Sequence, residues 1–204
     1  MIAIADYGVG NLMSVSNMLK KAGADVRITN EPKCILDAEK ILLPGVGHFD
    51  HGMKMLNASG LREAIDHYAL ELKRPVLGIC LGAQILGNGS AEGDSPGLGW
   101  IDMTCHRFKS MPGIRIPHMG WNQITCKKTS PLFDYVQEDA RFYFVHSYCM
   151  QCADSNDVLA TTLHGVEFTS AVQRGNIFGT QFHPEKSLRH GLALIKAFVE
   201  LQHA

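Results

Sequence analysis

The size, composition and charge of the chain place it among ordinary globular proteins and exclude several partners. It has 204 residues, of which 46% are hydrophobic and 19% charged, and its formal net charge is -1. This length suits one domain with a substantial core, so we expect residues 1–204 to form a single domain. The charge gives no electrostatic reason to expect nucleic acid or an acidic membrane surface as a partner. The longest apolar runs are too short to cross a bilayer.

The cysteines and the first residues indicate a cytoplasmic protein. Six cysteines are scattered without framework spacing, which predicts reduced thiols. The start, Met1-Ile-Ala-Ile-Ala-Asp6, has no basic region and runs directly into strand-like sequence, so we expect no signal peptide. Cys149-x-x-Cys152 beside His146 is a weak metal pattern, and a strand running into a loop explains it better. We expect no metal and no organic cofactor.

The first half of the chain alternates strand-like and helix-like segments. In order, the sequence predicts a strand at 2–5, a helix at 12–22, strands at 26–29 and 40–44, helix over 49–73, a strand at 76–79 and a helix over 81–86. This alternation predicts an α/β fold whose sheet is mainly parallel, with helices on both faces. Functional groups then gather at the carboxyl ends of strands, where Gly8, Pro44 and Cys80 lie.

The second half has a different pattern. Short strand-like segments at 98–108, 122–126, 141–150, 158–163 and 168–172 are separated by glycines. They predict antiparallel strands and hairpins that extend the sheet. A last strand is expected at 177–182. Ser187 then suits the N-cap of a final helix whose core-facing stripe would be Leu188, Leu192, Ile195 and Val199.

Cys80 stands at a turn that favours a nucleophile. The stretch Gly78-Ile-Cys-Leu-Gly82 is a G-x-C-x-G version of the nucleophile elbow. A sharp strand-to-helix turn strains the nucleophile, and flanking glycines let neighbouring backbone come close. The start of the following helix offers free N–H groups and a positive dipole end, which favour a thiolate. The alternative is a buried structural cysteine on a glycine-rich turn.

The last strand ends at His183-Pro-Glu185, which supplies a candidate general base and a carboxylate to orient it. In extended backbone, residues i and i+2 project to the same side. Glu185 can therefore hold the His183 ring and stabilise its protonated form. His183 can in turn take the Cys80 proton and later protonate a leaving amine. Acyl transfer through a thioester also needs oxyanion donors, for which the Leu81 N–H and the turn at 44–47 are candidates.

Several motifs carry a family resemblance. Residues 78–84, with His183-Pro-Glu185, resemble the class I (triad) glutamine amidotransferases. A narrower branch is indicated by Asp6-Tyr-Gly-Val-Gly-Asn11, Pro44-Gly-Val-Gly-His-Phe49, Pro117-His-Met-Gly-Trp-Asn122, Tyr143-Phe-Val-His-Ser-Tyr148 and Phe182-His-Pro-Glu-Lys-Ser187. From end to end the chain resembles the glutaminase subunits of imidazole glycerol phosphate synthase. The resemblance implies a flavodoxin-like fold.

The resemblance also implies residue roles. Cys80 would be the nucleophile, His183 the base and acid, and Glu185 its orienting partner. The Val46 and Leu81 backbone would form the oxyanion hole, and the Val46 peptide would reorient before it donates, which ties activity to the partner. Glutamine would be held by Gly47, Gln84, Glu92, His146, Ser147 and Tyr148. The partner-facing surface would hold Asn11, Trp121, Asn122, Tyr143 and Lys186.

Some of these residues keep other interpretations. Ala83 stands where the family often has Met, and the stretch 87–96 is unusually glycine-rich, which bears most on Glu92. The segment 143–148 is foremost a buried strand. Trp121 could be a core residue, although a loop beside Gly and Asn suits an exposed interface anchor better. Lys186 could be a solvated charge.

The resemblance implies that the chain hydrolyses L-glutamine and passes ammonia to a (β/α)8-barrel cyclase subunit of the HisF type, as a heterodimer. The products would be imidazole glycerol phosphate, on the histidine pathway, and aminoimidazole carboxamide ribotide. One alternative keeps the chemistry and sends ammonia to the amidation of a surface sugar. Another is a cysteine hydrolase, or a non-catalytic stress protein, with a similar elbow.

Overall fold

The first half of the chain builds a parallel sheet with helices between its strands. In order, its elements are β1 (Ile2–Ala5), α1 (Leu12–Lys21), β2 (Val26–Thr29), α2 (Pro32–Asp37), β3 (Lys40–Gly45), α3 (Phe49–Ala58), α4 (Arg62–Asp66), a π-helix (His67–Glu71), β4 (Val76–Cys80) and α5 (Leu81–Gln84). The computed structural model describes residues 1–202. The strands pair in parallel in the order β2-β1-β3-β4, as the alternating segments predict.

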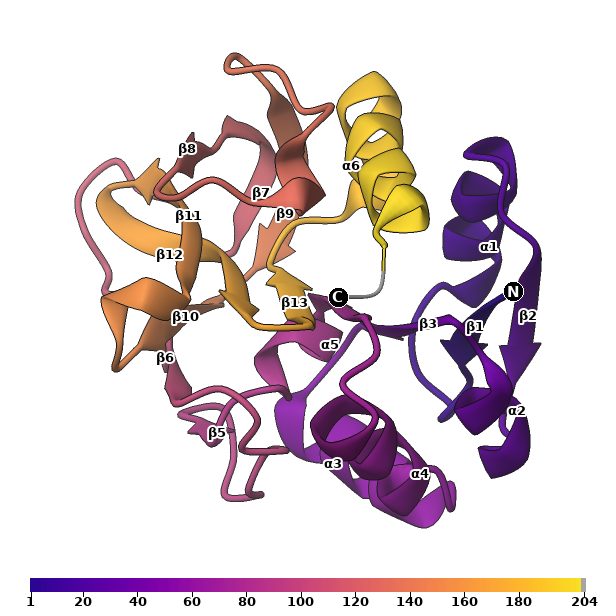
Figure 1. Ribbon diagram of the computed structural model, residues 1–204. Coiled ribbons are helices and arrows are strands. Elements are labelled where there is room, and N and C mark those ends of the chain that lie inside the picture. The colour runs from indigo at the N-terminus through magenta and orange to yellow at the C-terminus, as the bar shows by residue number, and fades with distance from the viewer. Residues whose placement is uncertain (203–204) are drawn as a thin grey trace.

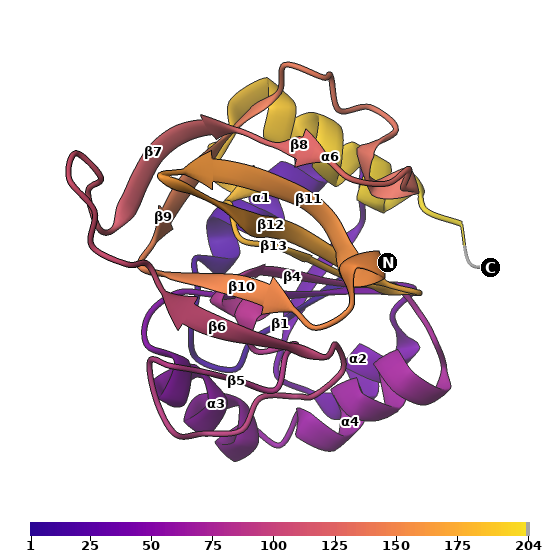
Figure 2. The ribbon, with the colours of Figure 1, turned by 90° about the vertical axis from the view of Figure 1, so that its left-hand side faces the viewer.

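The second half extends this sheet. It contains β5 (Gly89–Ser90), β6 (Met103–Arg107), β7 (His118–Gln123), β8 (Thr125–Cys126), β9 (Arg141–His146), β10 (Tyr148–Cys152), β11 (Val158–His164), β12 (Val166–Arg174), β13 (Ile177–Thr180) and α6 (Leu188–Glu200), with 3-10 turns η2 (Pro131–Phe133), η3 (Ser155–Asp157) and η4 (Pro184–Lys186). Strand β12 pairs antiparallel with β13, β10 and β11, and β10 with β6 (Figure 2). The predicted antiparallel extension is therefore confirmed.

Helices cover both faces of the parallel strands (Figure 1). Alternate residues of each strand enter two separate cores, because successive side chains of a strand point to opposite faces. Leu42 lies in the core that includes Leu19 of α1 and Phe198 of α6. Its neighbour Leu43 lies in the core that includes Phe49 of α3 and Ile65 of α4. No helix within residues 1–202 combines the length and apolarity that a bilayer crossing requires.

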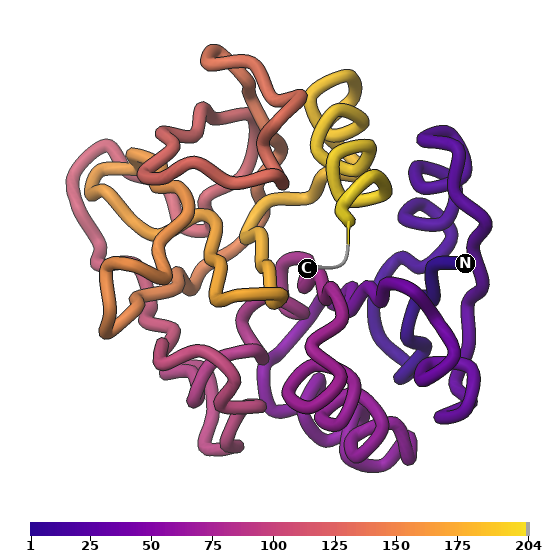
Figure 3. The backbone as a smooth tube through the Cα atoms, in the orientation of Figure 1, coloured from indigo at the N-terminus to yellow at the C-terminus, as the bar shows by residue number. Residues whose placement is uncertain are grey.

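Strand β13 brings the end of the chain back to its first half. It pairs in parallel with β4, with Thr180 opposite Ile79. Figure 3 shows this last part of the chain returning to the middle of the molecule before it enters α6. Because the two strands run in the same direction, Cys80 at the end of β4 and His183 just beyond β13 come to the same edge of the sheet.

The structure corrects the predicted helices at several points. Helix α2 begins at Pro32, an N-terminal helix signal that the predicted series omits. The predicted helix over 49–73 is broken where Gly60, with φ +76°, follows α3. In α6 the buried residues include Leu194 and Phe198, whereas Leu188 is 71% exposed. Of the predicted stripe only Ile195 is buried, and the buried positions of α6 are Gly191, Leu194, Ile195, Ala197 and Phe198, so a neighbouring side of the helix faces the core.

The predicted strands are corrected as well. The segment 98–108 is a strand only from Met103. The segment 141–150 is divided at Ser147 into β9 and β10. The two strands belong to different sheets, because β9 and β7 form a separate antiparallel pair whereas β10 pairs with β6 and β12. His146 Nδ1 bonds the Tyr148 carbonyl oxygen across the break at 2.7 Å, which holds the chain in its turn.

Candidate active site

The cysteine turn is strained, and its two glycines are required by close packing. Cys80 has φ +55° and ψ -110°, a left-handed conformation rare for a residue with a side chain. A Cβ at Gly82 would lie 1.6 Å from the Leu43 carbonyl oxygen, and one at Gly78 would lie 2.5 Å from the Gly82 carbonyl oxygen. The first turn of α5 therefore sits directly on β3 and β4, as the glycine spacing predicts.

Helix α5 ends two residues before the predicted range of 81–86. It spans four residues, Leu81–Gln84, and the chain then turns. A single turn sums few peptide dipoles, so the positive end of this helix contributes less to a thiolate than a long helix would. The charge of a nearby imidazolium is then the main support that the site can offer Cys80.

His183 and Glu185 form a buried pair. His183 Nδ1 lies 2.7 Å from Glu185 Oε1, and the two side chains are 1% and 4% exposed. Burial alone would lower the pKa of His183, but the Cys80 thiol and the Glu185 carboxylate outweigh it and raise this pKa to about 9. His183 Nε2 is buried and has no hydrogen-bond partner of ordinary geometry among residues 1–202. This nitrogen is therefore available to exchange a proton with Cys80.

One cavity of about 200 Å³ is lined by Cys80 and His183, two of the three predicted catalytic residues. It is lined by Val46, Gly47, Cys80, Leu81, Gln84, Glu92, Val145, His146, Ser147, Tyr148 and His183. All the predicted oxyanion and glutamine-binding residues are in this set. A larger cleft of about 830 Å³ lies elsewhere and includes none of them.

The predicted oxyanion residues come from two adjacent strand ends. Gly45, the last residue of β3, is the register partner of Cys80. Val46 follows and is 42% exposed, and Gly47 has φ +107°. Leu81, the residue after the nucleophile, begins α5. The peptides of the 45–47 turn thus lie beside Cys80.

The other wall of the cavity is held by hydrogen bonds between distant segments. Gln84 Nε2 donates to the Tyr148 carbonyl oxygen at 3.2 Å and to Gln181 Oε1 at 3.0 Å. Glu92 Oε2 accepts from the Phe49 N–H at 2.9 Å, at the start of α3. The glycine-rich stretch is thereby tied to α3, with the Glu92 carboxylate in the cavity wall.

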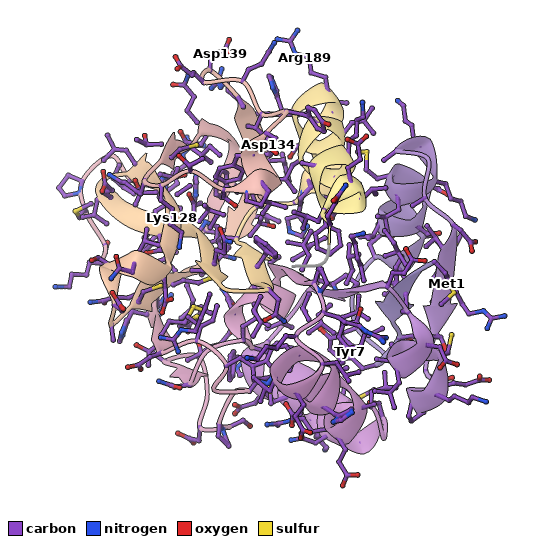
Figure 4. All side chains as sticks on the ribbon, in the orientation of Figure 1. Met1, Tyr7, Lys128, Asp134, Asp139 and Arg189 are labelled. Atoms are coloured by element: carbon purple, nitrogen blue, oxygen red, sulfur yellow. The ribbon has the colours of Figure 1, made fainter. Side chains whose placement is uncertain are left out.

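Sequence reasoning missed residues behind the cysteine. Gln181 is fully buried, and its Nε2 lies 3.8 Å from Cys80 Sγ as a donor. Its only sequence signal is the i, i+2 relation to His183. Tyr7 lies in the interior (Figure 4), and a Cβ at Gly45 would be 2.9 Å from its hydroxyl oxygen. Burial, and then Cys80, raise the pKa of Tyr7.

Three predicted partner-surface residues form one cluster. Trp121 on β7 pairs with Tyr143 on β9, and their rings meet edge to face at 6.2 Å. Lys186 Nζ lies 5.8 Å from the centre of the Tyr143 ring. Trp121 is 41% exposed, as predicted, but it lies on a strand rather than in a loop.

The other two predicted surface residues have internal roles. Asn11 is the N-cap of α1, and its side chain accepts from the Ser14 N–H at 3.2 Å. The Asn122 amide nitrogen donates to the Leu163 carbonyl oxygen at 2.9 Å and meets His118 Nε2 at 3.2 Å. Asn11 remains exposed, whereas Asn122 is half-buried and its amide makes contacts within the chain.

The cysteine pair at 149 and 152 is explained by a strand. Both residues belong to β10 and, three positions apart, point to opposite faces. All six cysteines are free thiols. No cluster of three or more His, Cys, Asp or Glu side chains suited to a metal occurs within the described part of the chain.

Comparisons with known proteins found a matching family, relatives of similar sequence and a structure of similar fold. The model of the family "Glutamine amidotransferase class-I" matches residues 3–201. "Imidazole glycerol phosphate synthase subunit HisH 2" of Pseudomonas aeruginosa is 49% identical over 98% of this chain and 100% of its own length. The protein of the same name from Methanococcus maripaludis is 48% identical over 98% of this chain and 99% of its own. A crystal structure titled as a glutamine amidotransferase is similar in fold, with TM-score 0.76, 18% identity, and coverage of 98% of this chain and 97% of its own.

Proposed function

Because the chain belongs to the class I glutamine amidotransferases, we propose that it hydrolyses L-glutamine to glutamate and ammonia at Cys80. The observation that carries this proposal is the single cavity that Cys80 and His183 line, with Glu185 bonded to His183 behind it. Residues 1–204 would act as one glutamine amidotransferase domain. The free cysteines support a cytoplasmic location, where thiols stay reduced.

In the first half of the reaction, His183 Nε2 takes the Cys80 proton and the thiolate attacks the glutamine side-chain carbonyl. The new C–S bond gives a tetrahedral intermediate whose oxyanion would accept hydrogen bonds from the Leu81 and Val46 N–H groups. Each such donor is worth roughly 3–4 kcal/mol of barrier. His183 then gives its proton to the leaving nitrogen, the C–N bond breaks, and ammonia departs from a thioester.

In the second half, water replaces ammonia. His183 takes a proton from the water as it attacks the thioester carbonyl, and the C–S bond breaks to release glutamate and restore Cys80. Gly47, Gln84, Glu92, His146, Ser147 and Tyr148 would hold the rest of the substrate. The Glu92 carboxylate suits the ammonium group of glutamine. One of its oxygens accepts the hydrogen bond from the Phe49 N–H, which leaves the other oxygen for that contact.

We further propose that the chain is the glutaminase subunit of imidazole glycerol phosphate synthase, bound to a (β/α)8-barrel cyclase of the HisF type. The names of the similar proteins support this assignment. The exposed Trp121, next to Tyr143 and Lys186, would be the centre of the interface, since buried aromatic anchors dominate binding energy at interfaces.

A second acceptor for the ammonia remains a candidate. The relatives from Pseudomonas aeruginosa and Methanococcus maripaludis carry the numeral 2 in their names. This numbering supports considering a paralogous subunit that feeds the amidation of a surface sugar.

Complementation separates the two acceptors. The gene is placed, together with the gene of the partner synthase from the same genome, in a host that lacks both synthase subunits. Growth without histidine at low ammonia, lost in Cys80→Ala, is expected. Absence of growth, with both proteins soluble and associated, would overturn the histidine-pathway role and favour the sugar pathway.

A further inference from the structure

A series of hydrogen bonds, centred on the buried rings of His118 and His146, leads from Asn122 to the wall of the glutamine cavity. Asn122 Nδ2 lies 3.2 Å from His118 Nε2. His118 Nδ1 lies 3.0 Å from His146 Nε2, and His146 Nδ1 lies 2.7 Å from the Tyr148 carbonyl oxygen. This series of hydrogen bonds links β7, the strand that carries Trp121, to the break between β9 and β10.

The direction of every bond in this series is fixed by its last member. A carbonyl oxygen only accepts, so the hydrogen of His146 is on Nδ1 and its Nε2 must accept. His118 therefore carries its hydrogen on Nδ1, and its own Nε2 accepts from the Asn122 amide. Burial lowers the pKa of His146 to about 3 and that of His118 to about 4, which agrees with two neutral rings.

Aromatic packing holds His118 in this orientation. Its ring stacks on Phe144 at 4.6 Å and on His164 at 4.1 Å between centroids. Phe168 meets it edge to face at 5.7 Å. His164 is not a member of this hydrogen-bond series, because its Nε2 donates to the Arg115 carbonyl oxygen. The His118 ring is thus fixed on both faces, and its two nitrogens point along the series.

The hydrogen-bond series ends at Tyr148, which is part of the cavity wall. His146, Ser147 and Tyr148 line the cavity in sequence. The Tyr148 carbonyl oxygen accepts from His146 Nδ1 at 2.7 Å and from Gln84 Nε2 at 3.2 Å. Two donors from different elements therefore fix this carbonyl and the turn that it ends.

We propose that His118 is a positioning residue for glutamine. It donates a hydrogen bond to His146 Nε2 and so fixes the His146 ring, and His146 in turn holds the turn at Ser147 and Tyr148 in the shape that receives the substrate. The inference rests on the proposed glutaminase function. His118 touches neither Cys80 nor the cavity, so it governs how well glutamine is held rather than the chemical steps.

Three variants test this role in the complex of the chain with its partner synthase, assayed for glutamate release. His118→Phe keeps the stacked ring and removes the donor to His146. His118→Asn restores an amide N–H near the former Nδ1. His164→Phe changes the same aromatic cluster outside the hydrogen-bond series and serves as the matched control.

We expect His118→Phe to raise KM for glutamine about 10-fold, the size expected for one lost hydrogen bond, with kcat within about 3-fold. His118→Asn recovers most of the KM, and His164→Phe leaves it unchanged. An unchanged KM in His118→Phe, or an equal rise in His164→Phe, would overturn the inference.

A second measurement is independent of activity and of variant folding. Nitrogen-15 spectra of histidine-labelled wild-type protein report which ring nitrogen carries hydrogen. The inference requires the Nδ1–H form for both His118 and His146, and the Nε2–H form of either ring contradicts it. If the wild-type complex shows these tautomers but releases no glutamate, the proposed function fails and the hydrogen-bond series stands.

Discussion

Replacing Glu185 with Gln tests the catalytic pair most directly. The substitution keeps a side chain of similar shape beside His183 Nδ1 and removes the negative charge. The pKa of His183 is raised to about 9, from an ordinary value of 6.5, by Cys80 and Glu185 against the opposing effect of burial. At about 1.4 kcal/mol for each pKa unit, this rise favours the imidazolium by about 3 kcal/mol.

The direction of the pH effect follows from the sign of this shift. A raised pKa means that His183 stays protonated, and can support the Cys80 thiolate, until the pH passes about 9. Without the carboxylate this pKa falls, because burial still opposes the charge. The alkaline limb of kcat/KM for glutamine hydrolysis should move down by at least ~1 pH unit. The loss of general acid–base catalysis by His183 should also lower kcat/KM by about 10²- to 10⁴-fold.

The assay is glutamate release from pH 6 to pH 10 by the chain with its partner synthase. The chain offers a matched control in His67 and Glu71, an exposed pair whose atoms lie 3.1 Å apart. Glu71→Gln should leave the profile unchanged, because exposed pairs contribute little. The reasoning fails if Glu185→Gln keeps both the alkaline limb and wild-type activity within about 3-fold.

Three other substitutions give separable outcomes. Cys80→Ala should abolish glutamine hydrolysis but leave an ammonia-driven synthase reaction intact, and loss of that reaction would mean that Cys80 is structural. Gly82→Ala should destabilise the fold by ~3 kcal/mol or more in urea unfolding, because its Cβ would lie 1.6 Å from a β3 carbonyl oxygen, whereas Gly89→Ala, with only one ordinary contact, should not. Trp121→Ala should weaken partner binding by ~2 kcal/mol in calorimetry. Leu70→Ala, at an exposed residue of the π-helix His67–Glu71, serves as the control, and an equal loss of binding in it would contradict the proposed interface.

Local sequence was sufficient for the features that short-range geometry decides. The elbow at Cys80 depends on glycines two residues away on each side. The contact of Glu185 with His183 also forms between near neighbours in the chain, although Glu185 lies in the 3-10 turn η4 and not in the extended backbone that the sequence analysis assumed. The alternation of segments likewise indicated the parallel sheet, because a parallel connection requires a crossover. Each of these predictions needs only neighbours along the chain.

Tertiary structure decided the contacts between distant segments. Gln181 reaches Cys80 and Gln84 only because β13 returns beside β4. His118 meets His146 only because β7 pairs with β9 in that register. A period of two tells which residues of a strand share a face, but the partner strand and its register depend on the whole chain, so the groups around the reactive cysteine could be predicted only in part.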